Sequence, residues 1–110
     1  MINVSFKRNE NDDPIAFRMC GHAGYDESGH DIVCASVSAL MINFVNSVEA
    51  LTKDRFVVEE KNEAKGLISF SFKGNPSSKG LLLIKSFELG VRTIREENCK
   101  KFIRIKDWEV

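Results

Sequence analysis

Hydrophobic and polar residues follow a regular pattern in seven separate stretches of the chain. Alternation with a period of two predicts strands over residues 2–7, 15–20, 67–72 and 102–108, and a shorter run at 56–58 predicts a strand that fades into 59–61. Spacing of three and four residues predicts a helix from residue 32 to about 52 or 53. The expected buried stripe of this helix is Val37, Leu40, Met41, Phe44, Val45, Val48 and Leu51. A second, less regular helix is expected over residues 78–97, beginning at an N-cap serine in Ser77-Ser78, with apolar positions Leu81, Ile84, Leu89 and Val91.

The element order is therefore β-β-α-β-β-α-β. Hairpins combined with two helices predict a single α+β domain spanning residues 1–110, with two helices on one face of a mostly antiparallel sheet. A chain of 110 residues, 43% of them hydrophobic, is large enough for one modest core.

Charge and cysteine content restrict the class of partner. The 16 basic and 16 acidic residues balance, so no direct nucleic-acid surface is expected. The first residues do not resemble a secretory signal, and no stretch approaches the roughly 18 to 20 apolar residues of a membrane span, so no membrane partner is expected. An odd number of cysteines, Cys20, Cys34 and Cys99, suggests thiols in a reducing cytoplasm.

Residues 21–40 carry the candidate chemistry. Asp31 precedes the first helical pattern and is a good N-cap, which would place Cys34 at the third helical position among unpaired backbone donors. The positive end of the helix dipole favours the thiolate form of a cysteine placed there. His22, just before a glycine-containing loop, could fold back against Cys34 as its base.

The same residues resemble the signature of a known family. Gly21-His22-Ala23, then Gly29, then Asp31-Ile32-Val33-Cys34-Ala35 and Val37-Ser38 are similar to the ribosomal-processing cysteine proteases, the Prp family. The resemblance implies that Cys34 is the nucleophile and His22 the general base. It also implies a substrate, the N-terminal extension of large-subunit ribosomal protein number twenty-seven of the L series, and a homodimer. This chemistry needs no metal or organic cofactor.

Supporting roles are expected around this pair. Asp31 would either cap the helix or orient His22, and backbone amides at the helix start, including that of Cys34, would stabilise the oxyanion. Ser38 lies one turn beyond Cys34 and either contacts the site or bonds back to its own helix. Gly21 would permit tight backbone beside the site. Residues 23–30, which include Ala23, Gly24 and Gly29, are a candidate substrate loop that orders over the peptide.

Two alternatives use the same residues differently. Cys20, His22, His30 and Cys34 could form a structural zinc site, although their spacing is not a familiar zinc pattern. An exposed Cys34 thiol with a lowered pKa would also suit a redox sensor. Cys99, in a polar connection, is expected to be incidental. The acidic residues are expected to be solvated or to meet a basic ribosomal-protein tail: Glu10, Asp12, Asp13, Asp26 and Glu27.

Overall fold

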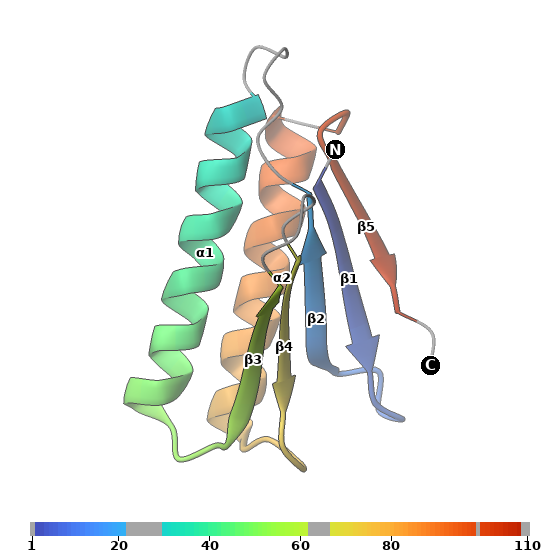
Figure 1. The fold of residues 1–110 in the computed structure, drawn as a ribbon. Helices are drawn as coiled ribbons and strands as arrows, with labels where there is room; N and C mark the ends of the chain where they lie inside the picture. The colour runs from blue at the N-terminus through green and yellow to red at the C-terminus, as the bar shows by residue number, and fades with distance from the viewer. Residues whose placement is uncertain (1, 22–29, 62–66, 99, 109–110) are drawn as a thin grey trace.

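The computed structural model describes residues 2–21, 30–61, 67–98 and 100–108. It contains the seven elements in the expected order (Figure 1). They are β1 (Ile2–Arg8), β2 (Pro14–Cys20), α1 (His30–Leu51), β3 (Phe56–Lys61), β4 (Leu67–Phe72), α2 (Ser78–Asn98) and β5 (Ile103–Asp107).

The five strands form one sheet in the order β3-β4-β2-β1-β5, and both helices cover the same face of it (Figure 1). The pairs β3–β4, β4–β2 and β2–β1 are antiparallel, whereas β1 and β5 are parallel. The predicted two-layer α+β fold with a mostly antiparallel sheet is therefore confirmed. The parallel pair follows from topology, because α2 carries the chain back along the sheet before β5 begins.

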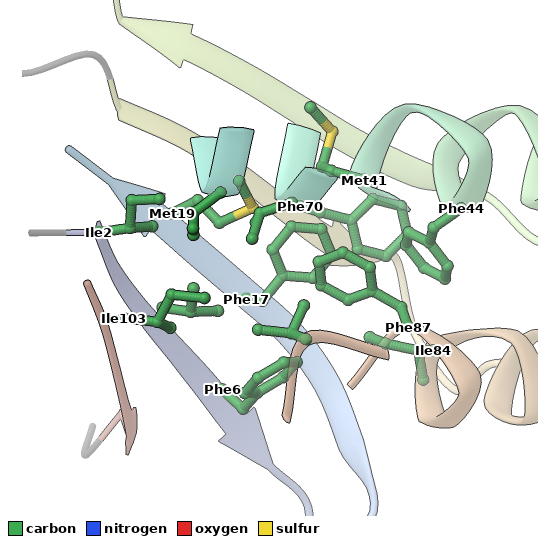
Figure 2. Close-up of a cluster of buried hydrophobic side chains, with 14 of the residues drawn as sticks. Ile2, Phe6, Phe17, Met19, Met41, Phe44, Phe70, Ile84, Phe87 and Ile103 are labelled. Carbon is green, nitrogen blue, oxygen red and sulfur yellow. The ribbon is translucent and has the colours of Figure 1, made fainter. Parts of the chain in front are cut away.

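Aromatic side chains fill the space between sheet and helices. Phe17 from the centre of the sheet lies 4.5 Å from Phe87 of α2, between ring centroids, and Phe44 of α1 lies 4.7 Å from Phe70 of β4 (Figure 2). All four are at most 3% exposed. Burying a side chain of this size contributes about 1.5 to 3 kcal/mol each, so this cluster fixes the helices to the sheet.

The two helices differ in how well their patterns predicted burial. In α1 the predicted stripe is confirmed at Val37, Met41, Phe44 and Val48, but Leu51 is 63% exposed at the helix end. In α2 the assignment of Leu89 to the buried face was wrong, because Leu89 is 67% exposed. The core position there is Phe87, which shares a face with Ile84 and Val91.

The two glycines of α2 have packing reasons. A Cβ at Gly90 would lie 2.9 Å from the end of the Leu40 side chain, so Gly90 lets α1 and α2 approach closely. A Cβ at Gly80 would lie 2.2 Å from the Asp54 carboxylate. That carboxylate holds Ser77, whose hydroxyl accepts the Gly80 amide at 3.1 Å. The expected N-cap serine of α2 is therefore Ser77.

The composition of α1 corrects one expectation. Residues Ile32–Leu51 are long and apolar enough, by length and composition, to cross a membrane. The core helix of a soluble domain passes the same test, and here one stripe of α1 packs on the sheet. The statement that no stretch approaches such a length was therefore wrong.

Candidate active site

Cys34 is held at one end of the molecule by the buried side chains around it. Val33 and Val37 are 3% and 0% exposed and fix this part of α1 against the sheet. Cys34 itself is half-buried and packs against the margin of the core. A nucleophile needs this combination, because its sulfur must be positioned by packing and still be reached by substrate.

The helix begins two residues earlier than its apolar pattern indicated. Because α1 starts at His30, Asp31 is its second residue and not its N-cap. Cys34 becomes the fifth residue, one position past the first turn. In an α-helix the amide of the fifth residue donates to the carbonyl of the first, which removes the Cys34 amide from the orphan donors expected to stabilise an oxyanion. The dipole effect on the thiol is also smaller beyond the first turn.

Gly21 follows β2 directly and is the last described residue before the candidate loop. Its φ of 115° lies in a region that side-chain-bearing residues rarely adopt, which explains a glycine at this position. The end of β2 and the start of α1 lie at the same end of the fold (Figure 1). The fold therefore brings the residue that precedes His22 to the end of the molecule that holds Cys34.

Several predicted site residues fall outside what the structure describes. His22 and the predicted substrate-loop residues Ala23, Gly24 and Gly29 lie outside the described ranges, as do Cys99 and the acidic pair Asp26 and Glu27. For His30 and Asp31 only the backbone is described. The roles assigned to their side chains stay predictions.

Ser38 follows Cys34 by one helical turn and is exposed. The serine that bonds back to its own helix is Ser36, whose hydroxyl donates to the Ile32 carbonyl at 2.9 Å. Ser38 thus lies beside Cys34 on accessible surface, where a substrate could meet it.

The zinc alternative finds no support in the position of the two described thiols. Cys20 pairs across the sheet with Asn3 and Leu67 and belongs to the face that the helices leave open. Cys34 packs toward the opposite, helix-covered face. Within the described ranges, no three His, Cys, Asp or Glu side chains are grouped to hold a metal ion.

The acidic turn between β1 and β2 lies at the far end of the hairpin from Gly21. Two of its carboxylates pair within the chain, with Asp13 2.9 Å from the Lys85 ammonium and Asp12 3.8 Å from Arg8. A position at the opposite end of the strands prevents this turn from lining a site around Cys34.

One charged network was not predicted from the sequence. Arg8 of β1 forms an ion pair with Glu88 of α2. Its Nε also lies 3.1 Å from the carboxylate of Asp107, the last residue of β5. Burial alone would lower the pKa of Arg8, but the hydrogen bonds and charges of Glu88 and Asp107 outweigh burial and raise the pKa. Glu88 is 80 residues from Arg8, so no local sequence signal marks the pair.

Comparison with known proteins places this arrangement in a family. Residues 1–104 match the family model of cysteine protease Prp. The chain is 30% identical to the ribosomal processing cysteine protease Prp of Bacillus subtilis over 109 residues, covering 96% of each chain. It is 31% identical to the protein of that name from Staphylococcus aureus over 97 residues, covering 88% of this chain and 91% of the relative.

Solved structures agree. The crystal structure of the S. aureus ribosomal processing protease Prp with a substrate peptide superimposes with a TM-score of 0.87 at 28% identity, covering 98% of this chain and 100% of that one. The same enzyme with a covalently linked product peptide gives 0.86 at 29% identity over the same shares. The sequence matches, the fold and the position of Cys34 near the start of α1 all agree with these proteins. The chain belongs to the Prp family of cysteine proteases.

Proposed function

We propose that this cysteine protease uses Cys34 as nucleophile and His22 as general base to remove the N-terminal extension of a large-subunit ribosomal protein, number twenty-seven of the L series. The observation that carries the proposal is the position of Cys34, half-buried at the start of α1 and at the same end of the fold as Gly21. The relatives' names, which describe ribosomal processing, support the class of substrate. A relative bound covalently to a product peptide supports a covalent route.

The chemistry follows from these two groups. His22 takes the Cys34 proton, and the thiolate attacks the scissile carbonyl carbon to form a tetrahedral oxyanion. Collapse breaks the carbon–nitrogen bond, His22 protonates the leaving amine, and the acyl group stays on sulfur as a thioester. Water activated by His22 then hydrolyses the thioester and restores the thiol.

Oxyanion stabilisation is assigned to the first turn of α1. The first amides of a helix have no carbonyl partner within it and point out of its N-terminus. Because Cys34 is the fifth residue, its thiol lies about one turn from these donors. A carbonyl attacked by that thiol would develop negative charge near them, which is what acyl transfer requires.

Exposed apolar side chains on both helices support a homodimer. Ile42 of α1 and Leu82 and Leu89 of α2 are 54%, 69% and 67% exposed. Light scattering coupled to gel filtration tests the homodimer, and a monomer at micromolar concentration would contradict it.

We assign the protein to the cytoplasm, where thiols such as Cys20 and Cys34 persist in reduced form.

The substrate assignment is tested with the extended ribosomal protein itself. Incubation with the purified enzyme should create one new N-terminus, which mass spectrometry would map. A version of the substrate without its extension is the matched control and should stay intact. If both proteins remain uncut while other peptides are cleaved, the substrate assignment fails and the protease assignment stands.

A further inference from the structure

The face of the sheet opposite the helices is open and can be defined residue by residue. The strand register places the same alternate positions of each strand on this side. We call it the open face; its described residues are Asn3, Ser5, Lys7, Ala16, Arg18, Cys20, Val57, Glu59, Leu67, Ser69, Ser71, Arg104, Lys106 and Trp108.

Positive charge is concentrated on this open face. Among the side chains that the structure describes on this face, four are cations and one is a carboxylate: Lys7, Arg18, Arg104, Lys106 and Glu59. The whole chain has zero formal net charge, whereas these five residues together carry a net charge of +3. The zero net charge, from which no nucleic-acid surface was expected, averages over faces and does not describe this one.

A single aromatic residue lies among these cations. The guanidinium of Arg18 stacks 3.5 Å from the centroid of the Trp108 ring, and the Lys7 ammonium lies 5.8 Å from it. The Trp108 amide donates to the Phe6 carbonyl at 2.6 Å, which anchors the residue beside β1. The ring therefore lies on the open face against Arg18.

A shallow groove of about 430 Å³ runs from this pair across β4 to β3. Its walls include Arg18, Trp108 and the hydroxyls of Ser69 and Ser71, with Glu59 at one side. The groove thus combines a cation, an aromatic ring and two hydroxyls with one carboxylate and the apolar residues Val57, Leu67 and Phe70.

We propose that the open face binds single-stranded RNA. Proteins that bind single strands combine cations that follow the phosphates with aromatic or arginine planes on which bases stack. An acidic peptide would use the cations but would leave the Arg18–Trp108 plane without a stacking partner. The groove lies across the sheet from α1, so bound RNA would leave Cys34 accessible. This proposal is independent of the proposed substrate.

Trp108 is the only tryptophan of the chain, so its fluorescence reports directly on the groove. The experiment titrates the protein with a fifteen-nucleotide oligouridylate at several salt concentrations. Binding should quench Trp108 fluorescence, and the binding constant should fall steeply as salt increases. In a plot of log binding constant against log salt concentration, each phosphate contact should add about 0.7 to the steepness of the slope. The double variant Arg104→Glu and Lys106→Glu should bind about tenfold or more weakly, with a reduced slope.

A charge-matched control uses exposed lysines away from the open face. Lys53→Glu with Lys79→Glu changes the net charge equally, and it should bind RNA as the unmodified protein does. Equal loss in both double variants would mean nonspecific attraction and would overturn the proposal. So would absence of quenching at 50 mM salt, or equal affinity for polyglutamate or for a duplex RNA. Both variants should cleave peptide normally, which separates this test from that of the protease.

Discussion

Arg8, the last residue of β1, forms an ion pair with Glu88, a carboxylate of α2 that is only 9% exposed. Arg92 donates to the same carboxylate at 2.9 Å, so Glu88 is shared between the sheet and its own helix. This link ties the end of β1 to the helix layer beside the aromatic core.

Replacing Glu88 with glutamine should lower the free energy of unfolding by about 1 to 3 kcal/mol, because the mostly buried Arg8 loses its main counter-charge. Urea unfolding measures the change. The matched control is Glu96→Gln, also on α2, where the carboxylate is exposed and pairs with Arg95 and Lys100. Similar losses from both variants would show that the Arg8–Glu88 pair has no special weight.

The two glycines of α2 should respond differently to alanine. Gly80→Ala forces the new Cβ against the Asp54 carboxylate, which accepts a hydrogen bond from the N-cap Ser77. It should lower the free energy of unfolding by about 1 to 3 kcal/mol. Gly90→Ala meets only the flexible end of Leu40, and the helix propensity of alanine offsets the contact by about 1 kcal/mol. Thermal melts of the pair test this. A Gly90→Ala protein less stable than Gly80→Ala would contradict the packing described.

The fold was largely predictable because its strands alternate cleanly and α1 has a strong apolar stripe. The errors have local causes. Leu89 was misassigned because three consecutive leucines, Leu81 to Leu83, blur the phase of the α2 stripe. The parallel β1–β5 pairing joins the two ends of the chain, and no local pattern encodes such a contact.

The candidate site was predictable to a different degree. Cys34 was found from its motif and its position near a helix start. The start itself was misplaced because His30 and Asp31 are polar, and the first turn of a helix can extend beyond its apolar stripe. The grouping of cations on the open face was not predicted, because Arg18 and Lys106 belong to strands that are distant in sequence. Only the register of the sheet, in which both pair with Ser5, shows that they share a face.

The position of Asp31 changes what its substitution should do. Asp31 is the second residue of α1, where a carboxylate interacts favourably with the helix dipole. Asp31→Asn should therefore lower the free energy of unfolding by about 0.3 to 1 kcal/mol while leaving most cleavage intact. An N-cap would have tolerated asparagine without loss. Thermal melts and peptide cleavage on one sample decide. A stable but inactive Asp31→Asn protein would instead assign Asp31 to orienting His22.

His22→Ala should remove most turnover while the protein stays folded, because the general base would be lost. Circular dichroism and a cleavage assay are measured on the same preparation. His30→Ala is the matched control and should retain activity, since it changes the other histidine of the chain. Near-normal cleavage by a folded His22→Ala protein would contradict the proposed pair.

The central claim is that Cys34 is the nucleophile, and cleavage by single-cysteine variants tests it most directly. The measurement compares Cys34→Ser with Cys20→Ser, both half-buried thiols of similar size, on a peptide that spans the extension junction. Mass spectrometry follows the new N-terminus and any acyl adduct on the enzyme. We predict that Cys20→Ser cleaves normally and that Cys34→Ser, although folded, forms no product and carries no thioester. Product formation by Cys34→Ser at the rate of the unmodified enzyme would contradict the account.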